Sequence, residues 1–219
     1  MLENKLYNNR FELFLISQLG VLFGSLFFPF QLFESFILPL LLLINLTAGV
    51  VLAQKKPILK KVLIGLIVIG IIAHIVQNFI LNVDLDVLRL VIYFLFYILV
   101  VSELITQVWK SKIVNKNIIS GLVSGYISLG LIAFFICLSI EALEPNSFSG
   151  INAEYYKDDL MYYSYITLLT IGYGDVLPIT PLAQKAAIFI GLIGQMYLVV
   201  ITAIVVGKYI NQISYEEKE

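Results

Sequence analysis

Charged residues are scarce in this chain of 219 residues, since Asp, Glu, Lys and Arg together make up only 13% of it. Soluble domains usually carry about 25% charged residues. Hydrophobic residues account for 60% of the chain. This balance argues against an ordinary soluble domain and favours an integral membrane protein. The formal net charge of −1 gives no electrostatic reason to expect a nucleic-acid partner, and we predict none.

Cysteine and histidine each occur once. Cys137 lies in an apolar run and has no second cysteine to pair with, so an intrachain disulfide is excluded. His74 is the single histidine, so a metal site built from several histidines of one chain is excluded too. We therefore expect no resident cofactor.

Six apolar stretches have roughly the 20 residues that a membrane-crossing helix needs. They cover residues 11–28, 36–53, 62–81, 87–109, 118–140 and 182–210. A polar stretch, 141–159, and a semi-apolar segment, 160–170, separate the last two. The segment 160–170 is too short to span a membrane and is typical of a re-entrant helix. The sequence thus predicts an all-α membrane protein with six transmembrane helices and a re-entrant helix between the fifth and sixth.

Basic residues support this layout. With a cytoplasmic N-terminus, the external segments hold only Arg89, Lys157 and Lys185, while the other 11 of the 14 basic residues are internal: Lys5, Arg10, Lys55, Lys56, Lys60, Lys61, Lys110, Lys112, Lys116, Lys208 and Lys218. Cytoplasmic loops of membrane proteins are enriched in Lys and Arg. We therefore expect a multi-pass protein of the cell membrane with both termini in the cytoplasm.

Acidic residues gather in the predicted external segments, at Glu34, Asp84, Asp86, Glu141, Glu144, Glu154, Asp158, Asp159 and Asp175. An anionic outer surface raises the local concentration of cations.

One short run between the fifth and sixth spans, "LLTIGYGD" at residues 168–175, cannot be helical throughout. Non-helical backbone at membrane depth must be buried in protein or line a water-filled cavity. Gly172 and Gly174 allow alternate residues to adopt positive φ angles. Such alternation aims successive carbonyls to one side, and four such runs around an axis would form oxygen rings that replace the hydration shell of a cation.

The longer stretch "DLMYYSYITLLTIGYGDVLP", residues 159–178, resembles the pore helix and selectivity filter of potassium channels. The resemblance covers about residues 118–210 and implies a homotetramer in the lipid bilayer. Each subunit would supply an outer helix, a pore helix, a filter and an inner helix. It further implies a filter of Thr170, Ile171, Gly172, Tyr173 and Gly174, with K+ bound at the carbonyls of the first four and at the Thr170 hydroxyl. Tyr at position 173, rather than Asp, favours potassium selectivity.

The match departs from the family pattern behind the filter. Leu169 replaces a frequent Thr, and Ile166 stands where some relatives have a glutamate. The family's aromatic pair, usually Trp-Trp, is Tyr162-Tyr163 here. We expect the Tyr163 hydroxyl to reach the Asp175 carboxylate. Tyr163, Thr167 and Asp175 are thus predicted to support the filter and its outer mouth.

The last apolar stretch resembles an inner helix that lines the ion path. Gly194 matches the family's hinge glycine by its spacing, although a glycine here also lets helices pack closely. The helical face that continues from Gly194 predicts pore-lining and gate residues at Gln195, Leu198, Thr202 and Val205. We expect a ring of Leu or Val side chains at the inner end to gate by dewetting.

The chain divides into residues 1–112, a four-helix domain resembling a voltage sensor without its charges, and residues 113–219, a pore domain with a short tail. A sensor needs about three to four arginines in its fourth helix, where only Arg89 stands. We therefore expect no conventional voltage gating, and a ligand-operated gate would need a separate, unknown regulatory subunit. Intramembrane His74 and Glu103 either act in gating or hydrogen-bond within their domain.

These features together predict a potassium-selective channel that conducts K+ passively through a tetrameric pore, and not an enzyme. A weakly selective monovalent cation channel is the first alternative, because Leu169 loosens the filter. The second is an intramembrane aspartyl protease, because Gly172 to Asp175 fit its G-x-G-D motif. That chemistry needs two aspartates that share a proton, and the other aspartates lie in predicted external segments: Asp84, Asp86, Asp158 and Asp159.

Overall fold

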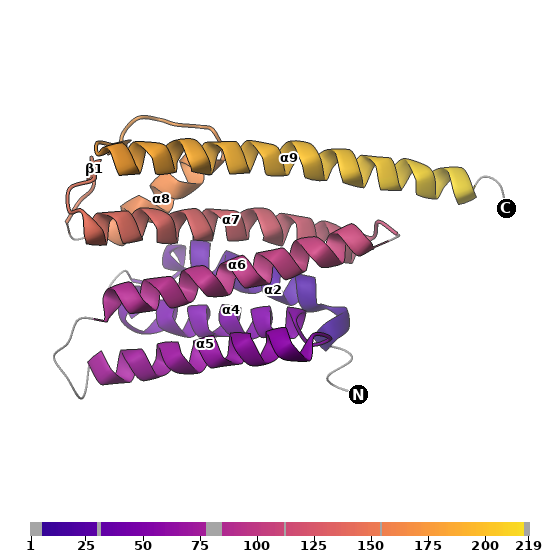
Figure 1. The fold of residues 1–219 in the computed structure, drawn as a ribbon, viewed down its shortest axis with the longest axis horizontal. Helices are drawn as coiled ribbons and strands as arrows, with labels where there is room; N and C mark the ends of the chain where they lie inside the picture. The colour runs from indigo at the N-terminus through magenta and orange to yellow at the C-terminus, as the bar shows by residue number, and fades with distance from the viewer. Residues whose placement is uncertain (1–5, 30–31, 78–84, 112, 154, 217–219) are drawn as a thin grey trace. The chain divides into compact units, whose positions relative to one another are not determined.

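The computed structural model of this chain describes residues 6–29, 32–77, 85–111, 113–153 and 155–216. Figure 1 shows a predominantly helical chain. Its elements in chain order are α2 (Arg10–Phe23), the 3₁₀ turn η1 (Gly24–Leu26), the π-helical turn η2 (Phe33–Ile37), α4 (Leu38–Leu52), α5 (Pro57–Ile75), α6 (Asp86–Lys110), α7 (Lys116–Leu143), β1 (Phe148–Ser149), α8 (Tyr156–Leu168), β2 (Leu177–Pro178) and α9 (Pro181–Glu216).

The helices divide into two compact units, and long helices contribute to both. Unit 1 comprises Met1–Val68, Leu99–Ile127 and Lys208–Glu219, and unit 2 comprises Ile69–Ile98 and Ser128–Gly207. In unit 1, α2 packs on α4, and apolar side chains from four helices are fully buried, among them Phe14, Leu52, Leu63 and Leu104. Burial of such side chains stabilises the unit in water-exposed regions, while close packing holds helices together within lipid.

Buried polar groups of unit 1 bond to one another across helices. The Asn45 amide of α4 donates to the Ser17 hydroxyl of α2 at 2.9 Å, and the Gln18 amide donates to the Ser124 carbonyl oxygen of α7 at 3.2 Å. An unpaired polar group in such an interior is costly, so these bonds favour one arrangement of α2, α4 and α7.

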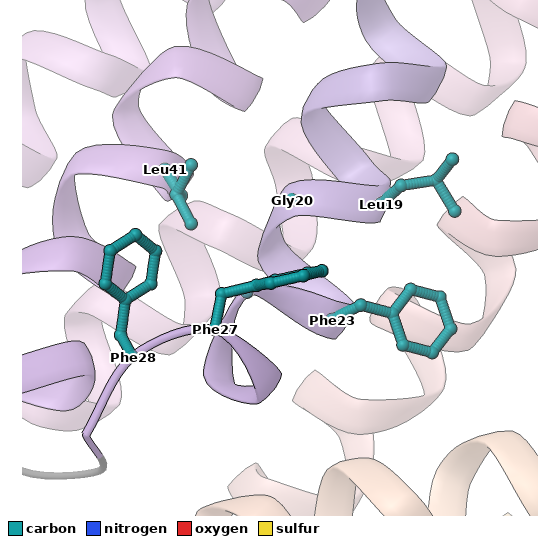
Figure 2. Close-up of a pocket in the computed structure, with 7 residues that line it drawn as sticks. Leu19, Gly20, Phe23, Phe27, Phe28 and Leu41 are labelled. Carbon is teal, nitrogen blue, oxygen red and sulfur yellow. The ribbon is translucent and has the colours of Figure 1, made fainter.

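The end of α2 and the start of α4 border an open apolar pocket of about 410 Å³. Figure 2 shows its lining, in which the ring of Phe27 lies between those of Phe28 and Phe23, with Leu41 and Gly20 to one side of this row. Its remaining lining residues are Leu19 and Gly24.

In unit 2, the short helix α8 lies against both α7 and α9 (Figure 1). The Ser164 hydroxyl of α8 donates to the Gly130 carbonyl oxygen of α7 at 3.3 Å. A Cβ at Gly130 would overlap the ring of Tyr165, so only glycine lets these two helices approach this closely. Aromatic stacking of Tyr97 on Phe135, with ring centroids 5.7 Å apart, completes the neighbouring core.

Three helices in the described part of the chain are long and apolar enough to cross a membrane: Val87–Lys110, Lys116–Leu143 and Pro181–Gln212. They confirm long apolar helices at the predicted spans 87–109, 118–140 and 182–210. The stretches 11–28 and 36–53 contain α2 and α4, helices of 14 and 15 residues, and 62–81 contains most of α5, a helix of 19. That these three also cross the membrane stays a prediction.

Some predicted features lie outside the described residues. They are residues 78–81 of the third predicted span, Lys5, Asp84, Lys112, Glu154 and Lys218, and the side chains of Glu34, His74 and Asp86.

Candidate functional site

The run 169–175 leaves the end of α8 as an irregular strand. The backbone N–H groups of Ile171 and Gly172 both donate to the carbonyl oxygen of Ile166, at 2.9 and 3.3 Å. The last carbonyls of a helix have no partner inside the helix, so these bonds satisfy one of them. They also fix the beginning of the strand directly on the end of α8.

Every second residue of this strand adopts a left-handed backbone. The φ angles are +58° at Thr170, +58° at Gly172 and +83° at Gly174. Glycine takes up this conformation freely, whereas it costs any other residue about 1–2 kcal/mol. The positive φ predicted at the two glycines is confirmed. Thr170 adopts it as well, a strained position for a β-branched residue that the sequence did not reveal.

The predicted partner of Asp175 is wrong by one residue. The hydroxyl of Tyr162, not that of Tyr163, donates to Asp175 Oδ2 at 2.7 Å. Successive residues of a helix point about 100° apart, so only one of the pair faces the strand. Tyr163 is buried and packs edge-on against Phe148, with ring centroids 5.2 Å apart.

The bond to Tyr162 holds the pKa of Asp175 below its usual value of 3.8, and the backbone N–H groups of Asp175 and Val176 add to this effect. The same bond raises the pKa of Tyr162 to about 12. Asp175 is therefore a carboxylate and Tyr162 a neutral donor at neutral pH. A carboxyl pKa lowered by folding gives stability that is present above the unfolded pKa and is lost as the pH falls through the folded pKa.

Replacing Tyr162 by Phe is expected to raise the pKa of Asp175 toward 3.8, because the largest contribution that lowers it is removed. The measurement is an NMR pH titration of the labelled Asp175 carboxyl. Tyr163→Phe is the matched control, since the hydroxyl that it removes makes no bond to Asp175. A larger shift in the control than in Tyr162→Phe would contradict the assignment.

A single carboxylate organises the turn that follows α7. Glu141 Oε1 accepts a hydrogen bond from the backbone N–H of Asn146 at 2.8 Å. Its Oε2 accepts from the N–H groups of Ser147 and Phe148, at 2.9 and 3.3 Å. This carboxylate, predicted only as part of an anionic surface, thus has a defined structural use.

That turn is joined to the C-terminal end of the strand 169–175. The short strands β1 and β2 pair antiparallel, Phe148 opposite Pro178 and Ser149 opposite Leu177, a small addition to the predicted all-α fold. Gly150 follows at φ +80°, and a Cβ there would overlap the Asp175 carbonyl oxygen. The turn is therefore packed directly on the backbone of the strand.

Replacing Glu141 by Gln is expected to destabilise this turn by about 2 kcal/mol, because an amide group would then face N–H donors that now meet a charged acceptor. The measurement is the free energy of unfolding of purified protein. Glu144→Gln is the matched control, because the Glu144 carboxylate is exposed and has no bonding partner in the described part of the chain. Equal effects of the two changes would contradict the role of Glu141.

The other predicted filter-support residue, Thr167, lies one helical turn from Tyr163. Both residues belong to α8, directly behind the strand. The structure brings them together, and their role in supporting a filter stays a prediction.

The predicted gate residues all lie on α9, which continues as one helix through Gly194. Gln195, Leu198 and Thr202 are exposed, and Val205 is half-buried. Gly194 itself is buried, and a Cβ there would overlap the carbonyl oxygen of Leu168 and lie 2.9 Å from its Cδ1. This close approach supports the packing interpretation of Gly194.

The C-terminal part of α9 belongs to unit 1. The ammonium of Lys208 donates to the carbonyl oxygens of Val108, Trp109 and Ser111, at 3.2, 2.7 and 2.7 Å. Carbonyls at the end of a helix lack partners within the helix, and a cation at a helix C-terminus is favourable. The signal for this role in the sequence is a lysine near the end of an otherwise apolar stretch, which the charge distribution alone explains as positive-inside charge.

Glu103 is buried on α6 and forms an ion pair with Lys56. It also accepts a hydrogen bond from the Gln107 amide at 2.7 Å. Of the two interpretations left open for Glu103, bonding within its own unit is therefore confirmed.

Much of the apolar surface around the strand and α9 is uncovered in the single chain. The side chains of Ile171 and Tyr173 are 48% and 72% exposed. Only 11% of the apolar window of α9 is buried, against 61% for α7. An apolar surface of this extent is typical of contact with lipid or with another protein.

Residues 123–211 match a family model described as "Ion channel". No curated protein and no solved structure matches the chain. The family match supports an ion channel domain in this part of the chain, and with it passive ion conduction. The three long apolar helices fit an all-α membrane protein. In the part of the chain that the structure describes, no group of His, Cys, Asp and Glu is arranged to hold a metal ion.

Proposed function

We propose that the chain is one subunit of a homotetrameric, potassium-selective channel of the cell membrane that lets K+ pass down its electrochemical gradient. The alternating left-handed backbone at Thr170, Gly172 and Gly174 is the observation that carries this proposal. Alternation of this kind turns successive carbonyls to one side, and rings of such carbonyls replace the hydration shell of K+. The permeant ion would bind at the carbonyls of residues 170–173.

Exposure of the strand supports a tetramer. A single strand offers only one carbonyl per level, so a ring needs several copies around an axis. Tyr173 and the apolar side chains of α9 are exposed in one chain, which fits contacts with neighbouring copies. In this arrangement α8 is re-entrant, because its 13 residues span about 20 Å, too little to cross a bilayer.

The proposed path continues from the filter along α9, where Gln195, Leu198, Thr202 and Val205 line it and apolar side chains gate it by dewetting. Asp175 remains ionised at the outer mouth and attracts cations. Both termini lie in the cytoplasm in this orientation, as the distribution of basic residues indicates.

Voltage gating is not part of the proposal. The described α6 carries Arg89 and, at its last residue, Lys110 as basic residues. One charge that crosses the full field contributes only about 2.3 kcal/mol per 100 mV. The stimulus must therefore act in another way, for example through a regulatory subunit.

The test is a bilayer recording of the purified protein with K+ and Na+ on opposite sides. We expect a reversal potential close to the equilibrium potential of K+. The purified protein should have a mass of about four times 24.7 kDa, the mass of one chain. Equal permeability to both ions would favour the weakly selective channel. Cleavage of a membrane-spanning peptide without ion flux would favour the aspartyl protease. Voltage steps in the same recordings would show a shallow dependence of opening on voltage.

A further inference from the structure

Two cationic side chains of unit 1 share one aromatic ring. The guanidinium carbon of Arg10 lies 4.1 Å, and the ammonium of Lys55 4.5 Å, from the centroid of the Tyr7 ring. Arg10 also lies 4.3 Å from the centroid of Phe11. Tyr7 lies three residues before Arg10, the first residue of α2, whereas Lys55 lies in the turn between α4 and α5. Folding thus brings two separate positive charges to one place.

Arg10 is held in a fixed orientation. Its Nε donates to Gln107 Oε1 at 2.7 Å and its Nη1 to the Tyr7 carbonyl oxygen at 2.8 Å. Gln107 is fixed in turn, because its amide donates to the Leu52 carbonyl oxygen at 2.7 Å. A guanidinium has five N–H donors, and these bonds use two of them. Donors therefore remain for a further acceptor at a preorganised position.

The positive charge of this cluster is not neutralised by carboxylates of the described residues. Glu103 attracts Arg10 through space, but its own ion pair is with Lys56. The nearby Glu12 pairs with Lys116 at 3.4 Å. Neither Arg10 nor Lys55 has a carboxylate at ion-pair distance in the part of the chain that the structure describes. Two cations on one ring, with no carboxylate of the described residues at ion-pair distance, favour an external anion.

The surroundings indicate where this anion comes from. Lys60 and Lys61 follow in the first turns of α5, and Ile58 beside them is 80% exposed. Basic residues beside exposed apolar side chains are typical of the headgroup region of a membrane. Arg10 and Lys55 are also among the residues that the positive-inside pattern places at the cytoplasmic face.

We propose that Arg10 and Lys55, arranged around Tyr7, bind the phosphate of an anionic phospholipid in the cytoplasmic leaflet. Arg10 offers its remaining N–H donors to the phosphate oxygens, and Lys55 contributes a second positive charge from the turn between α4 and α5. The phosphate joins the start of α2 to the turn between α4 and α5. This site goes beyond the proposed conduction and does not depend on ion selectivity.

The test uses the full-length protein in phosphatidylcholine nanodiscs that contain increasing amounts of phosphatidylglycerol. The apparent affinity is obtained from the rise in melting temperature. Each cationic side chain near a membrane surface contributes roughly a factor of five in affinity. We therefore expect Lys55→Gln to weaken binding about fivefold and the double variant Arg10→Gln, Lys55→Gln about 30-fold. Lys185→Gln, a change of an exposed lysine on α9, is the control and should have no effect.

Several results would overturn this proposal. One is an unchanged affinity for phosphatidylglycerol in the double variant, and another is an equal loss in Lys185→Gln. Stabilisation by inorganic phosphate in phosphatidylcholine nanodiscs as strong as that by phosphatidylglycerol would assign the site to a soluble anion instead. If Arg10→Gln fails to fold, Arg10→Lys replaces it, and we expect weaker binding in both Arg10→Lys and Lys55→Gln, because a lysine lacks the fixed guanidinium donors. Parent-like binding in both would overturn the proposal. Lipid binding without K+ flux would refute the proposed conduction and leave this site standing.

Discussion

Replacing Gly172 by Ala is expected to reduce potassium conduction at least about a thousandfold. An L residue at the φ of +58° found here costs about 1–2 kcal/mol in each chain. Four copies in a tetramer would raise the energy of the conducting strand arrangement by about 4–8 kcal/mol, and each 1.4 kcal/mol changes a population tenfold. The strand would then populate other conformations, in which the carbonyls do not form rings.

Gly65→Ala is the matched control for this change. A Cβ meets no atom within 4 Å at either position, but Gly65 lies inside the helix α5, where Ala is the more favourable residue. The control should therefore conduct K+ like the parent protein and unfold no more easily. The measurement is the K+ current per reconstituted tetramer, together with the reversal potential. Parent-like current and selectivity of Gly172→Ala would refute both the strand mechanism and its conformational basis.

The sequence predicted the backbone of the site better than its side-chain contacts. Glycines at alternate positions have one strong physical consequence, so positive φ at Gly172 and Gly174 followed directly. Thr170 adopts the same conformation because the fold imposes it against the residue's own preference. Local sequence contains no signal for such a tertiary constraint.

Assignments that depend on the rotation of a helix were less secure. Tyr162 and Tyr163 are chemically identical, and only the orientation of α8 on α7 and α9 decides which hydroxyl reaches Asp175. The bonds of Glu141 to three N–H groups of one turn were likewise hidden, because an acidic residue after an apolar stretch is most simply read as surface charge.

Long apolar helices were predicted well where composition alone decides their extent, as for α6, α7 and α9. The predicted limits differ from the observed ones mainly by polar end residues, which continue a helix without adding to its apolar run. The first stretch is different. The helix α2 ends at Phe23 and continues as a 3₁₀ turn, although its apolar run continues to Phe28. Hydropathy reports the solvent that a segment prefers, not the residue at which its backbone hydrogen bonding changes.

Replacing Gly194 by Ala is expected to destabilise the protein by about 1–3 kcal/mol per chain and to lower K+ current with it. The new methyl group would overlap the backbone carbonyl oxygen of Leu168, an atom that cannot move without moving the end of α8. The strand 169–175 begins at that end, so the displacement is transmitted to the proposed filter. A glycine that served only as a hinge would give another result, since Ala would then leave stability unchanged and alter only the frequency of opening.

Gly191→Ala separates these two interpretations, because it makes the same change one helical turn earlier in α9. A Cβ at Gly191 would lie 4.0 Å from the Thr167 carbonyl oxygen, an ordinary contact. Both substitutions stiffen the helix to the same degree. A packing effect at Gly194 lowers the melting temperature, whereas a hinge effect at Gly194 leaves the melting temperature unchanged. We expect a lower melting temperature for Gly194→Ala alone. A parent-like melting temperature with fewer openings in bilayer recordings would instead establish Gly194 as a hinge, and the close approach of α9 to α8 would then have to open during gating.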